Sequence, residues 1–335
     1  EDQFIADAIG NGFGAGEARQ LWQQLQRFGR YSFNKAHAAS YGLLAWRSAW
    51  LKAHYPAEFL CALFRHHAGM YPFAAFVAEA RRRGVPLRLP CVERSTETFT
   101  LESDGSIRMP LTMILGSRQS SIESVFAGRP FDSPEDLMRR TRIGMAELEE
   151  WILVGALDHF EIPRTRLLWR TRTRYRHLSA TRNQLTTGDL AGIVDEGPDL
   201  VELSPQKLLE HEIRLLGAGV SAHPMQFHRD IQRRLGCISL SEVPRKAGDR
   251  VRISGSRIAS RHHPSARGAM GFITLEDEHG TCEVTCFSSI WPSVRRTLLD
   301  GSGPLLVEGK VEERLGAVSV IAHRVTRLVP QQQTS

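Results

Sequence analysis

Gly271-Phe272-Ile273-Thr274-Leu275 and Cys282-Glu283-Val284-Thr285-Cys286-Phe287 are the stretches that decide the fold of the last part of this sequence. Both are rich in β-branched and aromatic residues and alternate in polarity, which is typical of β-strands. One similar run precedes them, around Val251 and Ile253, and two follow, at 305–311 and 317–321. The residues from about 249 to 328 therefore predict five strands.

One short helix, from Trp291 to Leu299, is expected between the third and fourth strands. This order of elements predicts an OB-fold, a five-stranded barrel whose groove and first long loop bind single-stranded nucleic acid. Phe272 and Phe287 alternate with core positions, and we expect both to be buried. A protein-binding OB domain is the alternative, because one common fold serves many functions.

The loop after the first predicted strand is basic, which fits an electrostatic track for a template strand. Its basic residues are Arg257, Arg261, His262, His263 and Arg267.

The composition predicts a folded, multidomain, cytoplasmic chain. Apolar residues make up 41% of the 335 residues, enough for the cores of several domains. No apolar run reaches the length of a membrane span, and the polar opening Glu1-Asp2-Gln3 is not a signal peptide. The sequence does not begin with Met, so we expect a fragment. The net charge of +6 is compatible with a polyanionic partner.

The five cysteines are scattered, and we expect reduced thiols rather than a disulfide framework. Cys282 and Cys286 are four residues apart, but a strand would hold them too far apart to share one metal ion. We therefore expect no metal site in this chain.

A helix, a tight glycine turn and a second helix are predicted between Leu111 and Phe126, with Gly116-Ser117-Arg118 at the turn. Hairpins of this kind present backbone N–H groups to a DNA phosphate, although many such patterns only pack helices together. Just before it, Asp104-Gly105 predicts the turn of a short β-hairpin.

A run of arginines without acidic residues lies between Arg164 and Arg182. Arg166, Arg170 and Arg174 recur every four residues, so on a helix they form one basic stripe suited to a phosphate backbone. The alternative is an ordinary solvated helix face.

Near the start, Phe33-Asn34-Lys35-Ala36-His37-Ala38-Ala39-Ser40-Tyr41 predicts a helix start, with Asn34 as the cap and Lys35 and His37 in the first turn. Such a helix start can receive phosphate, or the same residues can simply cap and be solvated. This stretch, followed by Trp50-Leu51-Lys52-Ala53-His54-Tyr55-Pro56-Ala57-Glu58-Phe59, resembles the end of the fingers region in bacterial C-family DNA polymerases, the DNA polymerase III alpha subunits and their error-prone relatives.

The resemblance continues along the chain. Arg108-Met109-Pro110-Leu111-Thr112-Met113-Ile114-Leu115-Gly116 and Val154-Gly155-Ala156-Leu157-Asp158 are similar to the family's helix-hairpin-helix domain. The family usually has a second glycine where Arg118 stands, and that side chain could hold a phosphate or block its approach.

The resemblance implies a multidomain α+β fold. We expect helical end of fingers at 1–84, a helix-hairpin-helix DNA-binding domain at 85–160, a basic helical connector at 161–248, an OB-fold domain at 249–328 and a tail at 329–335.

The family implies a parent enzyme that adds deoxynucleotides to a primer on a DNA template. That chemistry uses Mg²⁺ held by paired aspartates, and no Asp-x-Asp occurs here. We therefore expect the Mg²⁺ site in an upstream palm domain, no cofactor or catalytic residue in this fragment, and no activity of the fragment alone. Lys35 and His37 then assist nucleotide or template placement.

The expected partners are primer-template DNA, single-stranded template and deoxynucleoside triphosphates, with a sliding clamp or other accessory proteins as further candidates. Replicative and error-prone branches both stay open, as do a non-enzymatic nucleic-acid-binding adaptor and an inactive polymerase paralogue. DNA replication, repair and translesion synthesis are the processes that these branches imply.

Overall fold

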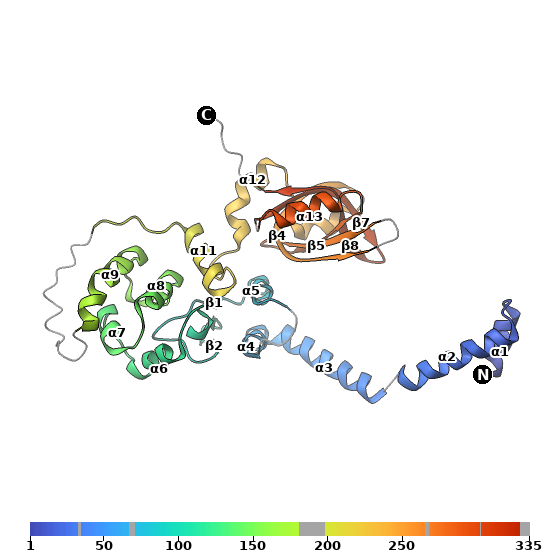
Figure 1. Ribbon diagram of the computed structural model, residues 1–335, viewed down its shortest axis with the longest axis horizontal. Coiled ribbons are helices and arrows are strands. Elements are labelled where there is room, and N and C mark those ends of the chain that lie inside the picture. Colours follow the sequence, from blue (N-terminus) through green and yellow to red (C-terminus); the bar gives the residue numbers. More distant parts are fainter. Residues whose placement is uncertain (33–34, 67–70, 181–197, 265–267, 302, 329–335) are drawn as a thin grey trace. The chain divides into compact units, whose positions relative to one another are not determined.

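The computed structural model describes residues 1–32, 35–66, 71–180, 198–264, 268–301 and 303–328 (Figure 1). They divide into two units, Glu1–Phe59 and Leu60–Ser335. Within the described residues, no helix is long and apolar enough to cross a membrane. The predicted tail at 329–335 lies outside the described residues, and the limits of the predicted domains stay predictions.

The first unit is helical. Helices α1 (Asp2–Gly10) and α2 (Ala15–Ser32) are joined by a glycine-containing turn. The rings of Phe4 and Trp22 lie 5.3 Å apart and pack the two helices together. Helix α3 (Lys35–His54) then runs without a proline or a buried residue. The next helix, α4 (Pro56–His66), begins at a proline, because proline suits the first turn of a helix.

A small sheet follows helix α5 (Phe73–Arg82) in the second unit. Strands β1 (Leu87–Arg88), β2 (Thr100–Leu101) and β3 (Ile107–Arg108) lie in the order β1-β3-β2, and β2 and β3 are antiparallel. The predicted hairpin is confirmed. Its turn needs a glycine, since Gly105 has φ +79°.

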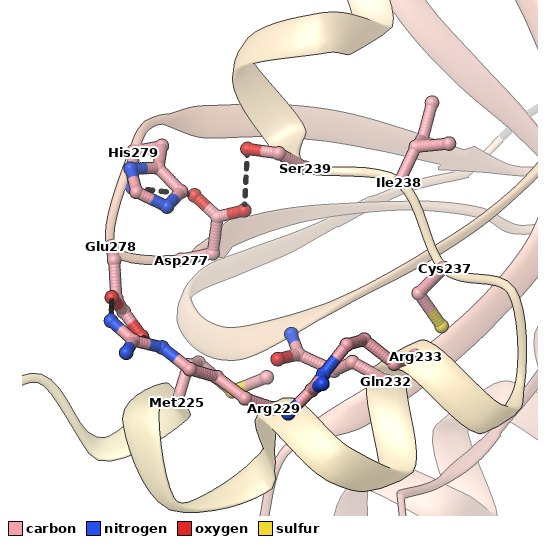
Figure 2. Close-up of a pocket in the computed structure, with 10 residues that line it drawn as sticks. All are labelled: Met225, Arg229, Gln232, Arg233, Cys237, Ile238, Ser239, Asp277, Glu278 and His279. Carbon is pink, nitrogen blue, oxygen red and sulfur yellow. Dashed lines mark hydrogen bonds and ion pairs between the residues drawn. The ribbon is translucent and has the colours of Figure 1, made fainter.

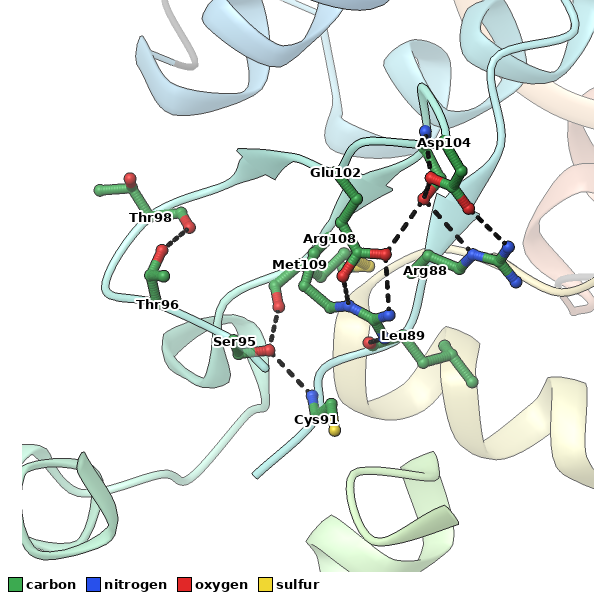
Figure 3. A network of polar contacts seen from close by, with 11 residues as sticks. Arg88, Leu89, Cys91, Ser95, Thr96, Thr98, Glu102, Asp104, Arg108 and Met109 are labelled. Carbon is green, nitrogen blue, oxygen red and sulfur yellow. Dashed lines mark hydrogen bonds and ion pairs between the residues drawn. The ribbon is translucent and has the colours of Figure 1, made fainter. Parts of the chain in front are cut away.

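Ion pairs fasten this sheet (Figure 3). The Arg108 guanidinium donates to both carboxylate oxygens of Glu102, at 2.8 and 3.1 Å, and to the carbonyl of Leu89. The hydrogen bond from Arg108 lowers the pKa of Glu102. Arg88 donates to Asp104, whose carboxylate also accepts from the Ser106 hydroxyl. The strands are therefore held by paired charges as well as by backbone bonds.

A compact helical body comes next in the chain. Its core contains the buried side chains of Ile122, Leu137, Leu148, Trp151 and Leu167. Its elements are η1 (Leu111–Met113), α6 (Gln119–Gly128), α7 (Pro134–Arg140), α8 (Met145–Val154), η2 (Asp158–Phe160) and α9 (Arg164–Ala180).

Helix α11 (Pro205–Leu216) has a serine cap at its start and a glycine at its end. The Ser204 hydroxyl accepts from the Lys207 amide, and Gly217 closes the helix with φ +81°. Short helices η3 (Pro224–His228), α12 (Arg229–Arg234) and η4 (Leu240–Lys246) lead to the barrel. His223 is a buried turn residue whose Nδ1 accepts from the Met225 amide.

The barrel is closed in the strand order β4-β5-β6-β8-β7, which confirms the OB-fold prediction. Its α13 helix lies between the third and fourth strands along the chain, as expected. The elements are β4 (Arg250–His263), β5 (Met270–Glu276), β6 (Thr281–Cys286), α13 (Trp291–Leu299), β7 (Leu305–Arg314) and β8 (Ala317–Arg327).

Gly271 of β5 leaves room for the indole of Trp291, because a Cβ atom at Gly271 would overlap that ring. Trp291 is buried in the barrel core with Ile273, Val284 and Val320. The interior is therefore filled by side chains, and a ligand must bind the outside of the barrel.

Candidate nucleic-acid interface

The first predicted hairpin forms, in a shortened version. A single 3-10 turn, η1, replaces the predicted first helix, and α6 begins at Gln119. Gly116 has φ +85° and open space around it, so glycine is needed there for the backbone turn and not for packing. The Ser117 hydroxyl accepts from the indole N–H of Trp151 at 2.8 Å, which ties the turn to α8.

Arg118 stands at the N-cap position of α6 and is turned toward α8. Its backbone N–H donates to Glu147 Oε1 at 2.7 Å, and its Nε donates to Oε2 at 3.3 Å. The Ser121 hydroxyl donates to the same Oε2 at 2.8 Å. The contact with Glu147 could not be predicted from the local sequence, because Glu147 lies on another helix. The prediction that Gly116, Ser117 and Arg118 contact DNA stays a prediction.

The second hairpin joins α8 to α9 through Gly155. Gly155 has φ +92°, and a Cβ atom there would overlap the Arg164 guanidinium and the Asp158 carboxylate. Arg164 donates to both oxygens of Asp158, at 2.9 and 2.6 Å, and to the carbonyl of Leu153. This turn is therefore closed by a buried arginine, and both its positive φ and the nearby Arg164 and Asp158 side chains favour glycine at position 155.

The arginine stripe is part of the packing between α7 and α9. Arg170 donates to Glu135 at 2.8 Å and Arg174 donates to the same oxygen at 2.6 Å, with all three side chains largely buried. Arg170 and Arg174 therefore differ from both alternatives given by the sequence: they are neither unpaired basic residues on an open face nor solvated residues of an ordinary helix surface. Arg166 is half-buried on the same helix. The prediction that the three arginines bind DNA stays a prediction.

The basic residues Arg257, Arg261, His262 and His263 were expected in the loop after the first strand, but they lie within strand β4, which extends to His263 and pairs there with β5. The Arg257 side chain is exposed, and 72% of the Arg261 side chain is exposed. The Arg261 guanidinium lies 5.1 Å from the centre of the Phe272 ring and donates to Glu283 at 2.9 Å. Arg267 lies outside the described residues.

The expectation that Phe272 and Phe287 are buried is wrong. Phe272 is half-buried on the outer face and Phe287 is 46% exposed. The reason is the strand period: Ile273 and Cys286 point inward, so their neighbours Phe272 and Phe287 point outward. Of the two rings, Phe272 lies beside Arg261, and Phe287 follows the end of β6.

Cys282 and Cys286 are buried in β6, and burial raises the pKa of the first thiol to about 11 and of the second to about 12. Among the described residues, no three His, Cys, Asp or Glu side chains gather to hold a metal ion.

In the first unit, Lys35 and His37 are exposed in the first turn of α3, and the His37 ring packs against Tyr41 with 4.4 Å between centroids. Asn34, the predicted cap, lies outside the described residues. The role predicted for Lys35 and His37 in placing nucleotide or template stays a prediction.

A pocket beside the barrel lies where helix α12, the start of η4 and the β5–β6 turn meet (Figure 2). Arg229 of α12 donates to Glu278, and the Asp277 carboxylate accepts from the Leu240 amide at 2.8 Å and from the Ser239 hydroxyl. The acidic side chains of this pocket, Asp277 and Glu278, therefore already form contacts that hold α12 and η4 against the β5–β6 turn.

A family model described as a helix-hairpin-helix motif matches residues 84–167. The error-prone DNA polymerase of Corynebacterium glutamicum is 30% identical over 323 residues, which are 95% of this chain and 29% of that protein. The error-prone DNA polymerase of Mycobacterium tuberculosis is 31% identical over 316 residues, or 92% of this chain and 28% of that protein. Over most of its length, the chain is therefore similar to error-prone DNA polymerases.

The chain spans less than a third of the length of the curated relatives it matches. Among solved structures, an OBody bound to hen egg-white lysozyme aligns with 28% of the chain and 93% of its own, at 15% identity and a TM-score of 0.23. A TM-score this low is no evidence of a shared overall fold.

Proposed function

We propose that this chain is the DNA-holding part of an error-prone type of DNA polymerase, which extends a primer on a DNA template during damage-induced synthesis or replication. The observation that carries the proposal is the relation to error-prone DNA polymerases over 92–95% of the chain. The helix-hairpin-helix match and the barrel support DNA contact, since both architectures bind nucleic acid in other proteins.

Within this proposal, the barrel face follows the single-stranded template. Arg257 and Arg261 supply positive charge, while Phe272 and Phe287 offer ring faces. Stacking of bases on aromatic rings tolerates any sequence, which suits an enzyme that must copy every template. Nucleotide addition, with its Mg²⁺ ions, belongs to the parent enzyme outside this chain.

The test is fluorescence anisotropy of the 335-residue chain with labelled primer-template and single-stranded DNA across a salt series. We expect salt-sensitive binding. Arg261→Ala should weaken it several-fold and reduce the salt slope by about one unit, because one phosphate contact is lost. Arg233→Ala is the matched control, since Arg233 is an exposed arginine on α12. Absence of salt-sensitive binding at low ionic strength would overturn the proposal.

Catalysis is tested separately by primer extension with Mg²⁺ and deoxynucleoside triphosphates. We expect none from this chain and extension by the complete parent protein. Extension by the 335-residue chain would contradict the assignment of the chemistry to other parts of the parent.

A further inference from the structure

Glu147 is a residue of helix α8, but its carboxylate lies at the start of helix α6. Only 4% of its side chain is exposed. Its carboxylate accepts from the Arg118 amide at 2.7 Å, from the Ser121 hydroxyl at 2.8 Å and from Arg118 Nε at 3.3 Å. Three donors at the turn of the first hairpin are thus directed at one internal anion.

These donors are of the kind that a DNA phosphate would use. A helix start combines unpaired N–H groups with partial positive charge, and it binds carboxylates and phosphates alike. A phosphate that came to the Arg118 amide would compete with Glu147 for the same hydrogen. It would also meet a negative charge a few ångströms away in surroundings that screen poorly.

We propose that Glu147 acts as an internal substitute for a DNA phosphate and closes the first hairpin against DNA. This inference rests on the proposed function, because it concerns the strength of DNA contact at that hairpin. Arg118 assists by pairing with the carboxylate, and its guanidinium lies over Gly144 at the start of α8. The contribution of this hairpin to DNA affinity is then small, and the barrel face contributes more.

The experiment compares Glu147→Gln with Glu149→Gln in the 335-residue chain. Glutamine keeps an oxygen that can accept from the Arg118 amide, so the cap is retained while the charge is removed. Glu149 lies on the same helix and pairs with the exposed Arg172, so its variant makes the same change in net charge away from the hairpin.

The probe is a fluorescent primer-template duplex with a single-stranded overhang, and circular dichroism checks folding. We expect Glu147→Gln to bind on the order of tenfold more tightly than the unaltered chain at low salt, with a steeper salt slope. Glu149→Gln should change affinity by no more than about twofold. Equal affinities of the two variants would overturn the inference.

Ser121→Ala is a second variant, for the case that Glu147→Gln does not fold. It removes one donor that holds Glu147 and leaves every charge in place. We expect tighter DNA binding by a few-fold, and unchanged affinity would count against the inference. If neither the unaltered chain nor any variant binds DNA, the proposed function itself fails. If the unaltered chain binds and these variants bind no better, only the role of Glu147 fails.

Discussion

Replacing Glu135 by Gln should markedly destabilise the helical body. The Glu135 carboxylate is the shared partner of Arg170 and Arg174, and all three side chains are largely buried. Removing one member of a buried ion pair costs about 3–5 kcal/mol, because the charge left behind has lost both water and its counter-ion. Glutamine still offers an oxygen to one arginine, so we expect the lower end, about 3 kcal/mol.

The assay is urea unfolding followed by circular dichroism. With a denaturant slope of about 2 kcal/mol per molar urea, the midpoint should fall by about 1.5 M. Glu149→Gln is the matched control, since it breaks a pair with Arg172, whose side chain is 64% exposed, and should cost less than about 1 kcal/mol. Equal midpoints for the two variants would refute the view that the arginine stripe is held by a buried charge.

Two further predictions concern the second hairpin and the small sheet. Gly155→Ala should cost more than about 2 kcal/mol, since it adds a clash with Arg164 to the backbone strain. Gly217→Ala, with a similar positive φ but open space, should cost only about 1 kcal/mol; thermal unfolding compares them. Glu102 has a lowered pKa in the folded chain because Arg108 donates to it. Its stabilisation is therefore present above the unfolded pKa and is lost as pH falls through the folded one. Glu102→Gln should flatten the acid side of the stability profile measured by urea midpoints, and an unchanged profile would contradict this assignment.

Strand alternation was sufficient to predict the barrel, because each strand has one buried face. The same period also fixes which aromatic residues face outward, and Phe272 and Phe287 were misjudged only because their apolar character was given more weight than their position. A hydrophobic residue on a strand is not necessarily a core residue, and its neighbours decide the matter.

The hairpin and the arginine stripe show that local sequence does not reveal the tertiary partners of a side chain. Spacing correctly placed Gly116 in a turn and Arg170 and Arg174 on one helix. It could not reveal that Glu147 would reach the turn or that Glu135 would meet the stripe, since both carboxylates come from other helices. Whether a basic residue is free for DNA depends on such distant partners, which only the fold brings together.

The parallel pairing of β6 with β8 has a consequence for how the chain is made. Glu283, Val284 and Thr285 pair with Ser319, Val320 and Ile321, so one edge of β6 stays open until the last strand has been synthesised. The helical body is complete in sequence long before that point and can fold on the ribosome, whereas the barrel must wait. During this interval an unpaired strand edge is exposed to other chains, which makes the time before β8 is synthesised the step at which aggregation of the barrel is most favoured.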